Sequence, residues 1–198
     1  MTFAADTPCT AFAGHRLIAS GSLVEVALKV KALADAGGVD TILVFEDETG
    51  KQAPLDLRGS PADVLARLAG AAPSPPPSEA PRVGRPRLGV TAREVTLLPR
   101  HWDWLAEQPG GASAALRRLV EEARRTHAGK DAARRAQEAA HRVMSALAGD
   151  LPGYEEALRA FYAGDGDAFE ARIGGWPAGV WDYVSRLAAR AREKLAEA

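Results

Sequence analysis

Residues 93–125 read REVTLLPRHWDWLAEQPGGASAALRRLVEEARR, and this stretch decides how the second half of the chain is organised. The segment Arg93–Leu98 stops at Pro99, which predicts a short strand followed by the start of a helix. Helical spacing continues over Arg100–Gln108 and is broken by the Pro-Gly-Gly that follows. A second helix is predicted from Ser113 to about residue 148, with a break near residue 129.

The predicted strand raises the question of its partner, because isolated strands and even single hairpins are marginal in water. Apolar groups on the first helix, Trp102 and Leu105, are expected to turn inward. Ser113 is expected to cap the second helix and to leave its first amide groups free for a phosphate. The predicted buried stripe of that helix comprises Leu116, Leu119, Val120 and Ala123.

This strand-helix-helix order resembles the ribbon-helix-helix family of DNA-binding proteins. The resemblance implies an obligate homodimer in which the Arg93–Leu98 strands of two copies pair into a ribbon. Such ribbons point polar side chains into the major groove, and the residues suited to this are Arg93 and Thr96. The adjacent Glu94 departs from that pattern, so a segment that only dimerises or packs on the rest of the chain remains an alternative.

A basic arm precedes the strand. The sequence RVGRPR at residues 82–87 resembles an AT-hook core, in which Gly-Arg-Pro places extended backbone in a narrow minor groove. Arg82, Arg85 and Arg87 are therefore candidate DNA-binding residues. Arg117 and Arg118 on the second helix are candidates for phosphate contacts, although arginines on helices are also common on solvated faces.

Charge is distributed unevenly around a formal net charge of −1. Residues 81–135 contain 12 basic and 6 acidic side chains, and 11 of the 12 basic ones are arginine. Residues 1–80 and 136–198 are both net acidic. A local positive field rich in arginine favours a polyanionic partner such as DNA.

The whole chain is predicted to be α+β, with four regions. Residues 1–70 are expected to form a small ββαββα domain, in which Thr41–Glu46 and Leu55–Leu57 supply the last two strands. Residues 71–83 are rich in Pro, Ala and Ser, which predicts a linker. Residues 84–127 hold the basic arm and the ribbon-helix-helix-like module, and residues 128–198 a helical region that ends with a helix over Ala178–Ala196.

Short stretches spread along the chain resemble an uncharacterised bacterial family, the domain of unknown function 2239. They are CTAF at residues 9–12, DLRGS at 56–60, GRPRLGV at 84–90, REVTLLPRHWDW at 93–104 and the segment 148–158. The resemblance covers nearly the whole chain, and it implies no activity.

Catalytic candidates are few, and the sequence favours a protein that is not an enzyme and needs no cofactor or metal. The four histidines are scattered, and no HExxH, CxxC or phosphate-binding glycine loop is present. A ligand or catalytic pocket around Asp56 and Arg58 remains an alternative for the N-terminal domain. The single cysteine, Cys9, and the lack of a long apolar run predict a cytoplasmic protein with no membrane partner.

Overall fold

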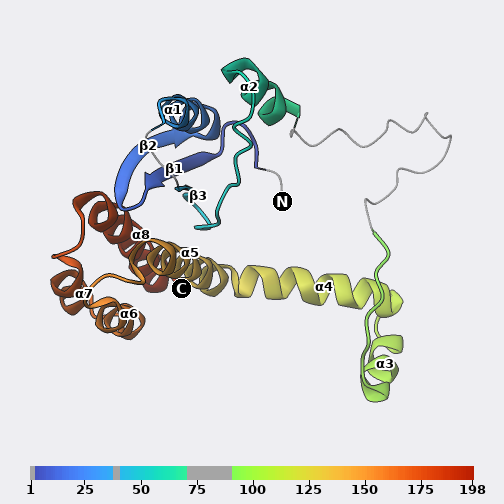
Figure 1. Cartoon of the computed structure of the whole chain (residues 1–198). Coiled ribbons are helices and arrows are strands. Elements are labelled where there is room, and N and C mark those ends of the chain that lie inside the picture. Colours follow the sequence, from blue (N-terminus) through green and yellow to red (C-terminus); the bar gives the residue numbers. More distant parts are fainter. Residues whose placement is uncertain (1–2, 38–40, 71–90) are drawn as a thin grey trace. The chain divides into compact units, whose positions relative to one another are not determined.

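The computed structural model describes residues 3–37, 41–70 and 91–198 (Figure 1). The chain divides into a larger unit, Met1–Pro73 with Gly129–Ala198, and a smaller unit, Ser74–Ala128. Segments predicted separately as 1–70 and 128–198 therefore pack together in the larger unit. Its elements are β1 (Pro8–Ala13), β2 (Arg16–Ser22), α1 (Leu23–Asp35), β3 (Ile42–Glu46), α2 (Pro61–Gly70), α5 (Ala128–Ala148), α6 (Tyr154–Ala163), α7 (Gly166–Ile173) and α8 (Ala178–Ala196).

An antiparallel sheet in the order β2-β1-β3 forms the centre of the larger unit. The α+β class is confirmed, but the described residues follow a β-β-α-β-α order, so the strand expected at Leu55–Leu57 is absent from them. After β3 the chain returns through one bridge, Phe45 to Gln52. The Glu46 amide donates to the Lys51 carbonyl (2.9 Å), and the Ala53 amide donates to the Val44 carbonyl (2.8 Å). Among the described residues, pairing with β3 ends after Ala53.

Both faces of β1 are buried. Successive strand residues point to opposite faces, so Cys9 and Ala11 join the cluster around α1, whereas Phe12 joins the cluster formed with α5 to α8. Figure 1 shows α1 on one side of the sheet and α5 and α8 on the other. The C-terminal helices therefore supply the second hydrophobic cover of the N-terminal sheet.

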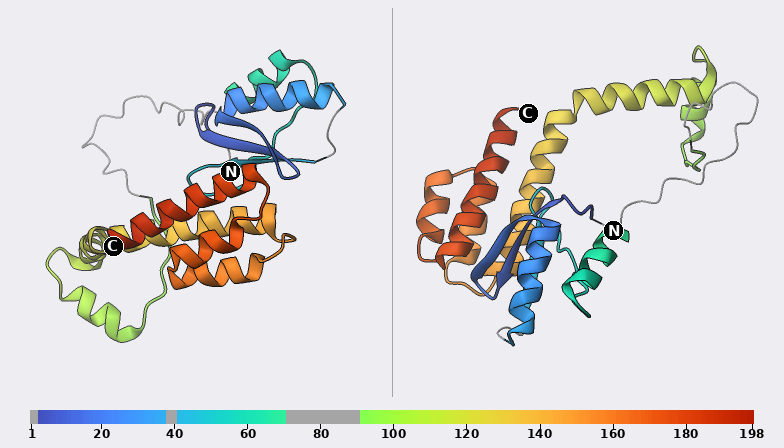
Figure 2. Two further views of the ribbon diagram at one scale, coloured as in Figure 1. Left: turned by 90° about the vertical axis from the view of Figure 1, so that its left-hand side faces the viewer. Right: turned by 90° about the horizontal axis from the view of Figure 1, so that it is seen from above.

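Local signals explain most of the helices. Ser22 and Glu25 form a capping box at the start of α1, where the Glu25 amide donates to Ser22 Oγ (3.3 Å). Asp165 caps α7 by accepting from the Ala168 amide (2.9 Å). The helix predicted over Ala178–Ala196 is confirmed as α8. Helices α5 to α8 pack side by side around a shared core, as the left view of Figure 2 shows.

The loop Asp47–Gly50 joins the sheet to the C-terminal helices. Tyr183 Oη on α8 donates to Asp47 Oδ1 (2.8 Å), and Arg190 Nη2 donates to the Glu48 carbonyl (2.7 Å). Arg142 Nη1 on α5 donates to the Thr49 carbonyl (2.6 Å). Two helices distant in sequence thus hold three consecutive residues of one turn.

The described part of the smaller unit contains two helices, α3 (Pro99–Ala106) and α4 (Gly111–Thr126), which follow residues 91–98. Pro99 occupies the first turn of α3, as the sequence predicts. Residues 91–98 form no strand within the described chain. The predicted ribbon requires a second copy, so a single chain leaves this prediction open.

Replacing Gly50 with Ala should destabilise the larger unit by more than about 3 kcal/mol. Gly50 has φ +64°, and an added Cβ would lie 2.4 Å from the Ala139 carbonyl oxygen. Gly164 has φ +73° with open space around it, so Gly164→Ala measures the backbone cost alone, about 1–2 kcal/mol. Urea unfolding of both variants tests this, and equal losses would refute the close approach at Gly50.

Candidate nucleic-acid interface

The smaller unit buries few of its large apolar side chains. Leu105 of α3 and Ala115 of α4 are the buried members of the described segment 91–128. Glycine with positive φ at Gly110 turns the chain sharply between the two helices, so that Leu105 can meet the first turns of α4. This contact leaves most of the amphipathic surface of α4 uncovered.

A groove of about 860 Å³ runs along this surface. Val95 from the extended segment, Trp102 from α3, and Leu116 and Val120 from α4 give it apolar walls. Val95 is 53% exposed and Val120 is 54% exposed, which is unusual for side chains of a helical hairpin core. Further exposed apolar groups of the same unit are Leu98, Trp104 and Leu119.

The prediction that the apolar side chains of these two helices are buried is therefore only partly correct. Leu105 is buried and Leu116 is partly buried, but Trp102, Leu119, Val120 and Ala123 are exposed. Two helices of 8 and 16 residues cannot enclose a stripe along the whole of the longer one. The periodicity correctly identified the apolar face of α4, but not its exposure in a single chain.

Three of the predicted DNA-binding residues meet at this groove. Arg93, Ser113 and Arg117 line it, together with Glu121. Thr96 and Arg118 are exposed but are not among the lining residues. Arg82, Arg85 and Arg87 lie outside the described residues.

The prediction that Ser113 caps α4 is wrong. The helix begins at Gly111, its N-cap is Gly110 with φ +84°, and no side chain accepts a hydrogen bond at that cap. The two glycines adopt backbone conformations that let the helix start before Ser113, which then lies in its first turn. No side chain therefore competes for the first amide groups of α4.

The arginines of the smaller unit fall into two groups. Arg124 pairs with Glu121 (2.7 Å), and Arg125 Nε donates to the Glu121 carbonyl (3.3 Å). Arg93, Arg117 and Arg118 make no ion pair with any residue that the structure describes. Residues 91–128 contain six arginines and five acidic residues, so the positive excess of the central region lies largely outside this segment.

Residues 8–188 match the domain of unknown function 2239, described as an uncharacterized protein conserved in bacteria. The chain belongs to this family. Searches of curated proteins and of solved structures found no match. The resemblance seen in short stretches of the sequence thus extends over most of the chain.

In this member of the family, the DLRGS stretch at residues 56–60 forms a self-contained turn. Asp56 Oδ1 accepts from Arg58 Nε (2.9 Å), and Asp56 Oδ2 accepts from Arg58 Nη2 (2.6 Å). Hydrogen bonds from Arg58, followed by its charge, lower the pKa of Asp56. Ser60 exchanges hydrogen bonds with Asp63 and so caps α2. Arg67 of α2 also donates from Nη2 to the Asp56 carbonyl (2.8 Å), so these polar groups connect the turn to the helix that follows it.

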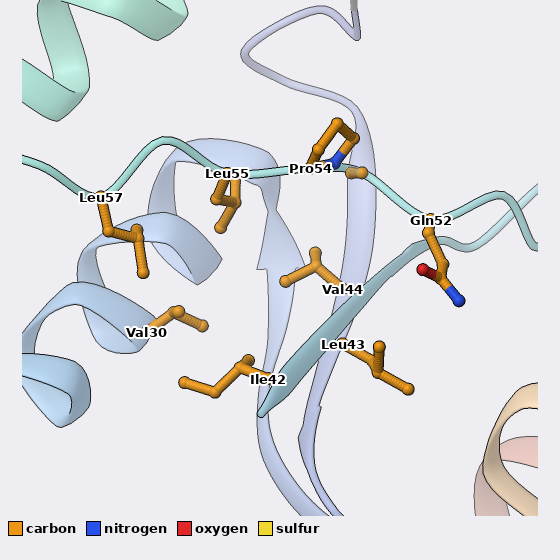
Figure 3. A pocket seen from close by; sticks show the side chains of 9 residues that line it. Val30, Ile42, Leu43, Val44, Gln52, Pro54, Leu55 and Leu57 are labelled. Carbon is orange, nitrogen blue, oxygen red and sulfur yellow. The ribbon is translucent and has the colours of Figure 1, made fainter. Parts of the chain in front are cut away.

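An apolar hollow of about 350 Å³ lies beside this turn, between α1, β3 and residues 52–57. Figure 3 shows Val30, Ile42, Val44, Leu55 and Leu57 pointing toward one another. Gln52 is the only polar side chain among the described residues that line it. The hollow arises because the chain diverges from β3 after Ala53, and its walls carry no acid, base or nucleophile.

The described histidines do not gather into one site. His141 Nδ1 lies 2.8 Å from Tyr162 Oη, and His15 Nε2 lies 3.7 Å from Asp150. Within the described ranges, no group of three or more His, Cys, Asp or Glu side chains is placed to hold a metal ion. None of the helices described is both long and apolar enough to cross a membrane.

Cys9, at the start of the CTAF stretch, is fully buried in β1. Burial, with a smaller contribution from Asp47 and Glu46, raises the pKa of its thiol to about 12. The thiol is therefore protonated at neutral pH, where a nucleophilic cysteine would need a thiolate.

The raised pKa of Cys9 predicts a loss of stability in alkali. Unfolding releases the thiol, which then ionises near pH 9, so the folded state loses stability as pH rises from about 9 toward 12. At pH 10 the loss relative to pH 8 should be about 1 kcal/mol. Cys9→Ala should lack this increment in urea unfolding, and an identical pH dependence in both proteins would contradict the assignment.

Proposed function

We propose that this chain acts as a homodimer assembled through the smaller unit, and that the dimer binds DNA as a regulator of transcription or a nucleoid-associated protein. The observation that carries the proposal is the exposed apolar groove between residues 91–95, α3 and α4. Contiguous exposed apolar surface of this kind marks interaction sites in soluble proteins.

A second copy of the chain is the occupant that fits this groove best. Residues 91–97 belong to no helix or strand and pair with no strand of the described chain, so their backbone groups are available to a neighbouring strand. Antiparallel pairing with the same segment of another copy is self-complementary under two-fold symmetry. It would bring the Val95 side chains of the two copies together and cover the groove of each.

The arginines of the smaller unit support DNA as the further partner. Arg93 and Arg117 line the groove, Arg118 is exposed on the same helix, and no described carboxylate pairs with any of the three. Dimerisation doubles every such charge, and it would bring a second copy of Arg82, Arg85 and Arg87 into the same assembly. Phosphate contacts by these groups would hold the dimer on the duplex.

Dimerisation predicts that Val95→Glu combined with Val120→Glu produces a monomer. Both side chains line the groove, so two carboxylates would be buried without partners and the dimer affinity should fall by more than about a hundredfold. Because both valines are already more than half exposed in the single chain, its own fold should persist. Sedimentation equilibrium should show a mass of 20.9 kDa for the variant and twice that for the unmodified protein.

Leu195→Glu provides the control, since Leu195 is 44% exposed on α8 of the larger unit. It should leave the dimer intact. A monomeric unmodified protein at micromolar concentration would exclude the proposed assembly.

DNA binding predicts a salt-dependent interaction that weakens when the arm is neutralised. Replacing Arg82, Arg85 and Arg87 with Ala removes three cations, so the slope of log affinity against log salt should fall by roughly 2–3. Fluorescence anisotropy with a random duplex across a salt series measures this slope. Replacing the exposed Arg16, Arg159 and Arg172 of the larger unit makes the same charge change and should alter the slope less.

A dimerising interaction module that does not bind DNA is the second candidate. The observation that favours it is the charge of residues 91–128, six arginines against five acidic residues. A dimer in sedimentation that shows no anisotropy change with duplex DNA at low salt would select this candidate. Neither function calls for a catalytic group, which agrees with the sparse catalytic candidates of the sequence.

A further inference from the structure

Helices α5 and α8 flank a second pocket in the larger unit, with a volume of about 220 Å³. Ala132, Arg135 and Ala136 lie on one face of α5 at helical spacing, and Arg190 and Lys194 lie one turn apart on α8. Glu48 from the loop after β3 also lines it. The two alanines provide the space, and three cations converge around it.

The three cations differ in the hydrogen bonds and ion pairs that they make with the rest of the protein. Arg135 is exposed and makes no hydrogen bond or ion pair with a described residue. Arg190 donates one Nη2 hydrogen bond to the Glu48 carbonyl (2.7 Å), which fixes its guanidinium without a carboxylate partner among the described residues. Lys194 Nζ pairs with Glu197 (2.7 Å). Two guanidinium groups therefore have unused N–H donors at this pocket.

Two observations bear on the local field. Hydrogen bonding and charge from Glu197 raise the pKa of Lys194, against burial and the repulsion of Arg190. Arg190 and Lys194 lie one turn apart on α8 and line the same pocket, so their positive charges add there. The carboxylate of Glu48 is exposed and is the one acidic group lining the pocket, so three positive side chains face one negative one.

We infer that this pocket between α5 and α8 binds a phosphate group, held by Arg135 and Arg190 with Lys194 at its edge. Guanidinium groups offer several N–H donors in a fixed plane and match phosphate oxygens well. A fixed guanidinium, a free one and a floor of small side chains suit a compact polyvalent anion. The inference does not depend on the proposed function, because the residues belong to the larger unit.

Inorganic pyrophosphate is the probe for the test, and the full chain is titrated with it by calorimetry at low salt. Arg135→Gln removes an exposed guanidinium that makes no hydrogen bond or ion pair with a described residue, so folding should be unaffected. We expect saturable binding to the unmodified protein and roughly tenfold weaker binding to this variant. The matched control is Arg134→Gln, because Arg134 is also exposed on α5, pairs with Asp131 and does not line the pocket.

A second pair of variants separates phosphate binding from the hydrogen bonds that arginines donate to the loop after β3. Arg190 and Arg142 each donate to a carbonyl of the loop after β3, but Arg142 also pairs with Glu138 and does not line the pocket. Arg190→Gln should weaken pyrophosphate binding roughly tenfold, and Arg142→Gln should not. No saturable binding to the unmodified protein, or equal weakening by pocket and control variants, would overturn the inference.

The source of the phosphate is decided by adding a short DNA duplex as a second titrant. Weakening of pyrophosphate binding alone in Arg135→Gln identifies a small phosphorylated ligand, whereas equal weakening of both identifies the DNA backbone. The protein with Arg82, Arg85 and Arg87 replaced should bind pyrophosphate normally even if it has lost DNA. Failure of the phosphate pocket and failure of the DNA-binding proposal are thereby distinguishable.

Discussion

The burial of β1 on both faces is the constraint on which the larger unit depends. Cys9 and Ala11 pack toward α1, while Phe12 packs among the C-terminal helices, so the strand needs two covers. One cover follows it directly in sequence, whereas the other arrives more than a hundred residues later. The interval between them contains the smaller unit, Ser74–Ala128.

The contact between the sheet and the C-terminal helices combines apolar packing with a buried network of hydrogen bonds. Phe12, Phe45 and Tyr183 form an aromatic cluster, with the Phe12 and Tyr183 ring centroids 5.5 Å apart. The hydroxyl groups of Tyr183 and Thr10 both donate to Asp47 Oδ1 at 2.8 Å. Burial is the main reason that the pKa of Tyr183 is raised, and Asp47 adds to it. A hydroxyl that remains protonated can act only as donor to this carboxylate, which fixes the direction of the network.

The sequence predicted those parts of the fold that local chemistry controls. Ala178–Ala196 has helical spacing and follows a proline, and Ser22 precedes Glu25 at capping-box spacing, so both helices were predictable. The absence of a strand at Leu55–Leu57 and the exposure of Leu119 and Val120 could not be predicted in this way. Apolar periodicity identifies the apolar face of a segment, but not which part of the protein covers that face. The pocket of Arg135 and Arg190 was also missed, since its two sides are separated by 55 positions and each alone has the pattern of a solvated helix face.

If the dimer binds DNA as proposed, the near neutrality of residues 91–128 means that most of the electrostatic contribution must come from other residues. The proposed ribbon carries Glu94 beside Arg93 and would therefore gain little from base contacts. Affinity for DNA would come from the arginines of the arm, residues 82–87, and from Arg117 and Arg118 of α4. In this proposal the smaller unit acts chiefly as the dimerisation module, through its apolar groove. Linking two weak arms raises their effective concentration for one another, so a dimer can bind a duplex that a single arm cannot retain. In the proposed function, association through Val95 and Val120 would therefore be the step on which DNA binding depends.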